Sequence, residues 1–334
     1  MRLIFTLSTL FMAMLAYAAP ISLEQALALA SELDAGVISA RADLAAAERD
    51  LARTRADPLA LRLTIAQAEQ ALENAQAALE SALSSSRAAL TNAYLAALEA
   101  DQTLAVAEQA EAIATIALEA SEIRFNAGAA TQLDLERARN DFGAAQRDRN
   151  DARQTRALTY SELASLVELL PEELTLQPVT ATPAIPELDS LLVRLAENRQ
   201  WRLTRQAVEL AELRLAAVDN AFSARAEVEA ARDALANAQV RLRETRRSLE
   251  LTMRQSHNAV LAAQSRLMSA AASAATASDT LSAQTLRYEA GSISRLEFER
   301  ARLDAARAEA QHQTARHALL RALLQLTRAL LGGP

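Results

Sequence analysis

Few side chains in this sequence are suited to chemistry. The three histidines are His257, His312 and His317, and the last two are five residues apart. Residues five apart do not share a helix face as residues four apart do, so we expect no metal site there. The absence of cysteine excludes disulfides and thiolate chemistry. The sequence therefore predicts no catalytic residue, no metal and no other cofactor, and we expect that the protein is not an enzyme.

The charged residues favour a solvated helical surface over a site for nucleic acid or phosphate. Acidic and arginine side chains are interleaved, as between Glu136 and Asp141, which is typical of an exposed helix face. The net charge is −7 and no long stretch is one-sidedly basic, so we expect no nucleic-acid partner. The sequence also contains neither a glycine-rich phosphate loop nor a nucleophile motif.

One motif occurs twice. Residues 124–139 read RFNAGAATQLDLERAR, and a similar stretch, RYEAGSISRLEFERAR, returns at 287–302. Arg124 thus corresponds to Arg287, and the same offset defines equivalent positions in the two halves of the chain. Two copies with the same neighbours indicate that a larger unit has been duplicated. Each copy predicts the end of one helix, a tight turn and the start of the next helix.

The residue types inside the motif explain this prediction. The glycine suits the position after a helix, where left-handed backbone costs a residue without a Cβ almost nothing. The hydroxyl residue suits the N-cap of the next helix, and the acid three residues later completes a capping box, more weakly with Asp than with Glu. These positions are Gly128, Thr131 and Asp134 in the first copy, and Gly291, Ser294 and Glu297 in the second.

Composition and periodicity predict an all-α fold. Hydrophobic residues make up 51% of the chain and aromatic residues 3%, with only 6 glycines and 7 prolines, which is typical of long packed helices. Apolar residues recur at steps of seven with one step of four, as in a coiled coil with a stutter. They are Ile65, Leu72, Leu79, Leu83 and Leu90 in the first copy, and Leu235, Leu242, Leu249, Met253, Val260 and Leu267 in the second.

Start and stop signals predict three helices in each half. Ser22 opens the first with a capping box, and Asp57 with Pro58 is expected to end it and to cap the next helix. The expected helices span residues 22–55, 59–125, 131–169, 188–218, 224–288 and 294–331. At about 1.5 Å per residue, the two short helices of a half fit end to end along the long one. Each half is therefore expected to be a long antiparallel coiled-coil hairpin of a short, a long and a short helix.

The chain divides into four predicted segments. Residues 1–18 combine a charged start, an apolar middle and small residues at positions 16 and 18, which is typical of a secretory signal peptide. Residues 19–169 form the first helical repeat, 170–187 a proline-rich linker and 188–334 the second repeat. The mature protein is therefore expected to be exported.

The order of these motifs resembles the outer-membrane factor family, the TolC-like efflux exit ducts. The tandem duplication with a proline-rich middle is similar too, so the resemblance covers essentially the whole mature chain. The matching stretches are SLEQAL at 22–27, NAYLAAL at 92–98, RFNAGAATQLD at 124–134, RQSHNAV at 254–260, and YEAG at 288–291 with LEF at 296–298.

The resemblance implies a homotrimeric α-barrel protomer that is periplasmic and outer-membrane-associated. Its implied partners are a periplasmic adaptor protein and, through it, an inner-membrane transporter. The six turn residues named above would lie at the inner end of the tunnel, where the adaptor docks and the tunnel closes. Glu297 matches an acidic position of the family's constriction, whereas Arg300 stands where the family has a second acid. The capping box is the alternative role of Glu297.

The sequence departs from the family between the first two helices of each half. Family members carry tens of residues there, which form the strands of an outer-membrane β-barrel. This chain has only residues 56–59 and 219–224 at these sites. A membrane strand needs about 9 to 11 residues, so we expect no self-formed transmembrane barrel. Leu59 and Phe222 are the sizeable apolar residues of these turns, and any outer-membrane contact is expected there.

Two functions are compatible with these patterns. The first is a TolC-like component of an envelope efflux or secretion conduit, whose tip turns dock a periplasmic adaptor. The second is a periplasmic coiled-coil scaffold derived from this family with no transport role. Alanines beside the leucine stripe fit both a barrel and a lone hairpin. A stable trimer would favour the conduit, and a monomer the scaffold.

Overall fold

The computed structural model describes residues 20–180 and 183–332. The predicted signal peptide at residues 1–18 lies outside them. The elements are α1 (Leu23–Leu33), α2 (Ala35–Ala56), α3 (Arg62–Asn126), α4 (Gln132–Val167), the 3₁₀ turn η1 (Pro171–Glu173), α5 (Leu188–Val193), the 3₁₀ turn η2 (Arg194–Glu197), α6 (Arg199–Val218), α7 (Arg225–Glu289) and α8 (Arg295–Leu331). Within the described ranges, β pairing is limited to one isolated bridge between Ile21 and Leu176.

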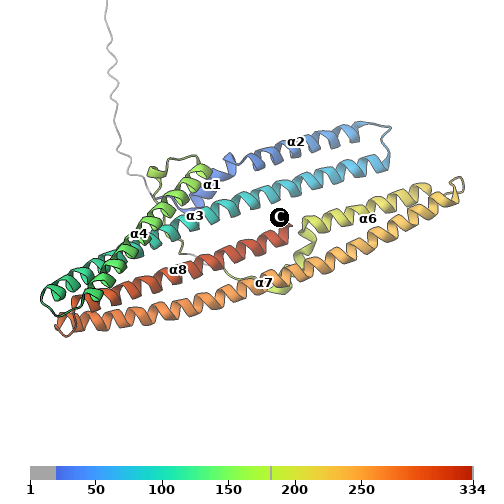
Figure 1. Cartoon of the computed structure of the whole chain (residues 1–334). Helices are drawn as coiled ribbons and strands as arrows, with labels where there is room; N and C mark the ends of the chain where they lie inside the picture. Colours follow the sequence, from blue (N-terminus) through green and yellow to red (C-terminus); the bar gives the residue numbers. More distant parts are fainter. Residues whose placement is uncertain (1–19, 181–182, 333–334) are drawn as a thin grey trace, which may run out of the picture.

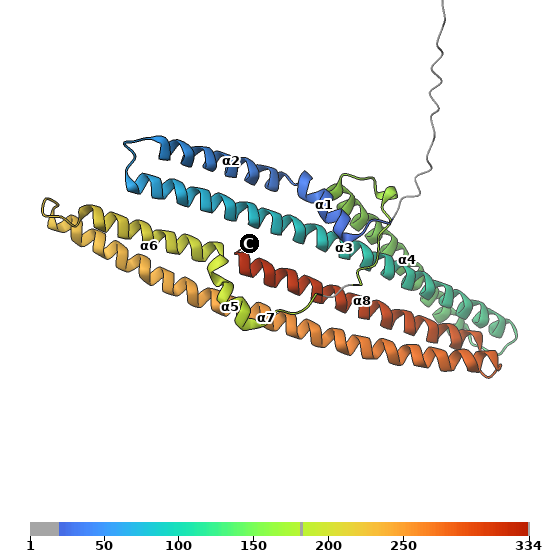
Figure 2. The same ribbon diagram turned by 180° about the vertical axis from the view of Figure 1, so that it is seen from behind.

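The helices form two long hairpins that lie side by side. The rods α3 and α7 have 65 residues each. Helices α2 and α4 follow one another along α3, and α6 and α8 follow one another along α7 (Figure 1). Helix α3 also packs against α6 and α8, which joins the two hairpins into one elongated body (Figure 2). The prediction of an all-α fold with two tandem antiparallel hairpins is confirmed.

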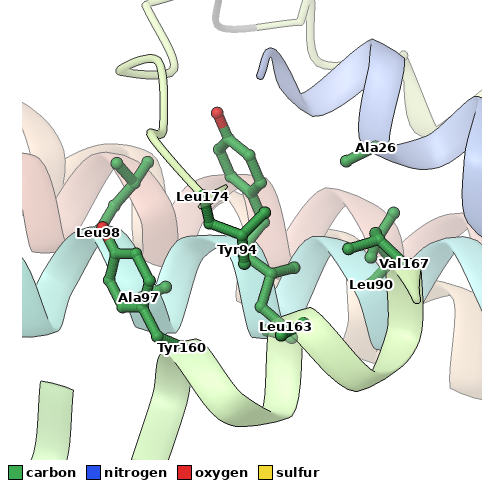
Figure 3. Packing of buried hydrophobic residues seen from close by; sticks show 11 residues of the cluster. Ala26, Leu90, Tyr94, Ala97, Leu98, Tyr160, Leu163, Val167 and Leu174 are labelled. Carbon is green, nitrogen blue, oxygen red and sulfur yellow. The ribbon is translucent and has the colours of Figure 1, made fainter. Parts of the chain in front are cut away.

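Each hairpin has its own core, and four positions of the two cores are equivalent in the repeats. The first lies where α1, α3, α4 and the linker meet, with Tyr94 fully buried at its centre (Figure 3). The second is formed by α5, η2, α7 and α8. At equivalent positions of the repeats, Leu90, Ala97, Leu163 and Val167 of the first core become Met253, Val260, Leu326 and Leu330 of the second. The duplication therefore includes the buried seam as well as the turns.

The first short helix of each half is broken, which the sequence interpretation missed. A single helix over residues 22–55 was expected, but Asp34 separates α1 from α2 because its carboxylate accepts from the amides of Gly36 and Val37. The helix expected over residues 188–218 is likewise divided at Asn198, whose side-chain oxygen caps the start of α6. Both residues offer the backbone an alternative to continuing the helix.

The expected role of Asp57 with Pro58 as the start of the long helix is wrong. Asp57 ends α2, and its Oδ1 accepts from the amide of Leu59 at 2.9 Å within a turn. Helix α3 begins only at Arg62, after Leu61, which supplies no side-chain cap. The apolar turn residues are well exposed, Leu59 at 85% and Phe222 at 100%. In the ranges that the structure describes, no helix combines the length and the hydropathy of a membrane span.

Candidate functional site at the hairpin tips

The two repeated turns have the same backbone geometry. Gly128 has a φ of 69° and Gly291 a φ of 70°, both in the left-handed region. The next amide reaches back to the helix in each case, from Ala129 to the Arg124 carbonyl and from Ser292 to the Arg287 carbonyl, both at 2.8 Å. A Cβ on either glycine would meet no atom within 4 Å. Glycine is therefore required by the backbone angle and not by crowding.

Complete capping boxes follow both turns. Thr131 Oγ1 accepts from the Asp134 amide, and Asp134 Oδ2 accepts from the Thr131 amide at 3.0 Å. Ser294 and Glu297 make the same reciprocal pair, with the Ser294 amide at 2.8 Å from Glu297 Oε2. Asp134 was expected to give the weaker version, but it closes its box in full. Thr131 also donates its hydroxyl to Asp134 Oδ2 at 2.6 Å, as Ser294 does to Glu297 Oε2 at 2.9 Å.

The acids of the boxes are held in their charged form. Hydrogen bonds from the Thr131 side chain and backbone lower the pKa of Asp134. Hydrogen bonds from the Ser294 backbone and side chain lower the pKa of Glu297, and the positive charges of Arg287 and Arg300 act in the same direction. Both tips therefore present a carboxylate in exposed turns at neutral pH.

The two tips lie at the same end of the molecule, opposite the α2–α3 and α6–α7 turns (Figure 1). The structure thus places Gly128, Thr131 and Asp134 on one tip, beside a second tip that carries the equivalent residues. Glu297 and Arg300 line one groove of about 770 Å³ between α7 and α8, together with Arg287 and Asp304. Two cations and two anions balance one another there.

Large apolar side chains are exposed close to the tips. Ile123 on α3 is 69% exposed, and Leu286, which stands at the equivalent position of α7, is 68% exposed. Leu133 in the first turn of α4 is exposed as well. These three side chains are called the apolar rim below, and exposed apolar area of this kind suits a protein contact. The sequence interpretation concentrated on the turn itself and missed this apolar rim, although the repeat offset applied to Ile123 would have found it.

An aromatic pair stiffens the second tip. The rings of Tyr288 and Phe298 stack with their centroids 4.8 Å apart and an angle of 10° between their planes. These residues end α7 and begin α8, so the stack fastens the two helices together next to the turn. The sequence interpretation missed this pair because residues ten apart meet only when the turn between them is known.

A polar cluster away from the tips joins the two repeats. Glu99 on α3 accepts from His317 Nδ1 at 3.0 Å and from both terminal nitrogens of Arg321 at 2.8 and 3.1 Å. These bonds oppose the effect of burial and lower the pKa of Glu99 overall.

His312, unlike His317, lies near Glu309 of its own helix. In the described ranges, no group of three or more histidine, aspartate or glutamate residues could hold a metal ion.

Solved outer-membrane channels share the fold of this chain. The Campylobacter jejuni CmeC outer membrane channel superposes with a TM-score of 0.69 at 13% identity, covering 93% of this chain and 86% of that one. The Vibrio cholerae outer membrane protein VceC gives a TM-score of 0.66 at 14% identity, covering 93% and 96%. A membrane protein from Pseudomonas aeruginosa gives 0.63 at 16% identity, covering 92% and 93%. At these identities the likeness concerns the fold.

The family follows from the sequence profile. The profile of the outer membrane efflux protein family matches residues 57–167 and 195–333, which together make up more than half of the chain. The chain therefore belongs to the outer membrane efflux protein family, a family of conduits and not of enzymes. No curated protein sequence matches the chain. The resemblance to TolC-like ducts is confirmed.

Proposed function

We propose that the protein is the outer-membrane-associated exit component of an envelope efflux or secretion conduit, and that its tips dock a periplasmic adaptor. The adaptor would connect it to an inner-membrane transporter. We further propose that the exported chain acts as a homotrimer. The scaffold alternative has no observation in its favour beyond those that the conduit explains equally well.

The observation that carries the proposal is the pair of matched tips at one end of the molecule. Both are held by left-handed glycines and closed capping boxes, so their surface is ordered before a partner arrives. The exposed Ile123 and Leu286 beside them offer apolar area for burial. A preformed surface binds without a large cost of ordering loops. Gly128, Thr131, Asp134, Gly291, Ser294 and Glu297 form this proposed docking surface, and Arg300 with Glu297 is the proposed constriction.

The test places a charge in the apolar rim. Ile123→Asp combined with Leu286→Asp should abolish binding of the purified mature protein to its periplasmic adaptor, measured by surface plasmon resonance with adaptor candidates from the same organism. Both side chains are exposed, so the helical content seen by circular dichroism should stay unchanged. Val193→Asp, at a position that is 82% exposed in α5 far from the tips, is the matched control and should bind as the unaltered protein does. Unimpaired binding by the double variant would refute docking at the tips.

A further inference from the structure

An apolar cavity of about 540 Å³ lies where the two repeats meet. Its wall combines elements that are far apart in the sequence, namely α1, the linker, α5 and α8. The volume falls within the range of about 300–1,000 Å³ that is usual for small-ligand sites. The lining is mainly aliphatic and includes Leu23 and Leu27 of α1, Pro186 of the linker, Leu191 of α5, and Leu323 and Leu330 of α8.

The polar side chains of this lining are already occupied. Thr91 and Thr327 each donate their hydroxyl to a carbonyl one turn back in their own helix, at 2.7 and 3.0 Å. Arg194 also lines the cavity, but Glu197 accepts from its Nε and its Nη2. A polypeptide segment would bring backbone N–H and C=O groups that need partners. A hydrocarbon chain needs none, so it suits the cavity better.

A smaller groove of about 290 Å³ continues the cavity. Leu324, Thr327 and Leu331 of α8 line both spaces. On α3, Thr91 lines the cavity, and Arg87 lines the groove from one turn earlier on the same helix face. The cavity and the groove therefore follow one another along the seam between α3 and α8.

The groove offers a positive charge. Arg87 and Arg328 line it, together with Glu80. Glu80 is already bound to Arg202 of α6, at 3.0 Å. In the part of the chain that the structure describes, Arg87 itself has no ion pair. The guanidinium of Arg87 is therefore available to an anionic group, which the apolar cavity beside it does not favour.

The repeat shows that the leucines of this seam are particular to the second half of the chain. Leu324 and Leu331 of α8 correspond to Ser161 and Glu168 in the first half. Both leucines are only half-buried. Because the equivalent positions are polar, the duplicated helical packing does not account for apolar residues here. Contact with a bound apolar molecule does account for them.

We propose that the cavity and the groove together bind a long-chain fatty acid. Its hydrocarbon chain lies among the leucines of α1, α5 and α8, and its carboxylate lies near Arg87. Helix α1 belongs to the first repeat and α8 to the second, so the bound chain joins the two repeats. This site is separate from the tips and does not rest on the function proposed for them.

Binding is measured on the purified mature protein with a dansyl-labelled fatty acid, whose emission rises in apolar surroundings. Dodecanoate and dodecanol are then added as competitors below their micellar concentrations, because they share the chain and differ in the head group. Dodecanoate should bind about tenfold more tightly, the effect of one charge-assisted hydrogen bond. Equal affinities would overturn the anionic end of the site. The absence of saturable probe binding would overturn the cavity as a ligand site, and equally strong competition by phosphatidylglycerol vesicles would overturn the fatty acid as its ligand.

Two variants test the two ends of the site. Arg87 is exposed, so Arg87→Gln should keep the fold, weaken dodecanoate about tenfold and leave dodecanol unchanged. Arg241→Gln is the matched control, at an exposed position of α7 that lines neither space, and should bind both as the unaltered protein does. Leu323→Phe narrows the cavity and should weaken both competitors, with circular dichroism as the check on folding. Unchanged dodecanoate binding by the Arg87 variant would refute the assignment of the head group.

Adaptor binding by the same variants separates this inference from the proposed function. Arg87→Gln should lose fatty-acid affinity while binding the adaptor as the unaltered protein does, because Arg87 lies in the groove and not at the tips. A variant that lost adaptor binding as well would show that the site and the tips are not independent, and would overturn this part of the inference.

Discussion

The left-handed glycines of the tips permit a sharp test, because the chain also has a glycine inside a helix. Gly128→Ala and Gly291→Ala place a Cβ at φ values of 69° and 70°. Left-handed backbone costs a residue other than glycine about 1–2 kcal/mol. The reduced freedom of the unfolded chain offsets about 0.4–1 kcal/mol of this. Each variant should therefore lower the free energy of unfolding by about 1 kcal/mol. No atom stands within 4 Å of the new Cβ, so steric conflict adds nothing.

Gly143→Ala is the matched control for these variants. Gly143 lies within α4, and a Cβ there would meet Arg147 Nη1 at 3.6 Å, an ordinary contact. The same chemical change should therefore raise the free energy of unfolding, by about 0.5–1 kcal/mol. Urea unfolding followed by circular dichroism measures all three variants. If the tip variants were as stable as the Gly143 variant, the tips would not depend on left-handed backbone, and our account of the turns would be refuted.

Two further predictions concern the middle and the far end of the molecule. Burial and the hydrogen bond to Asp101 raise the pKa of Tyr160 to about 12, above about 10 for an unfolded tyrosine. Its contribution to stability is therefore complete below pH 10 and is lost as the pH rises to 12, by at most about 2.7 kcal/mol. Thermal unfolding should show this loss, and Tyr160→Phe should reduce it; an equal loss in the variant would exclude Tyr160 as its source. At the far end, Leu59→Asp with Phe222→Asp should move the protein from the outer-membrane fraction to the soluble periplasmic fraction, and unchanged fractionation would refute membrane contact at these turns.

The regular part of the fold was predictable because it is periodic. The recurrence of residues 124–139 at 287–302 predicted the two tips and the number of hairpins. The apolar residues at steps of seven predicted the long helices. The observed bounds of α3 and α7 differ from the expected ones by three residues or fewer. The left-handed conformation of Gly128 and Gly291 was predictable because few residues other than glycine adopt it at low cost.

The features that were missed depend on contacts between distant segments or on competing local caps. Asp34 and Asn198 interrupt helices whose apolar pattern continues across them, because a side-chain oxygen replaces the next backbone bond. Glu99 gave no signal in the sequence, since its partners, His317 and Arg321, lie in the other repeat. A pairing between helices of different repeats requires the packing order, which periodicity does not contain.

Two equivalent positions near the middle of the long helices have different chemistry in the two repeats. Tyr94 lies against two carbonyl oxygens, at 2.8 Å from Ile21 and 2.7 Å from Gln177. Its counterpart in the second repeat is His257, whose Nε2 lies 3.1 Å from the Pro186 carbonyl. A carbonyl oxygen only accepts, so Nε2 of His257 is the donor in this contact. Burial raises the pKa of Tyr94, which keeps its hydroxyl a donor.

Both contacts therefore hold segments outside the hairpins against the long helices. The tips are organised differently, since their turns and caps bond only to residues within five positions along the chain. The nearby side chains of Ile123 and Leu286 are mostly exposed, at 69% and 68%. If the tips dock a partner as proposed, the docking surface can change while the body formed by the long helices stays the same.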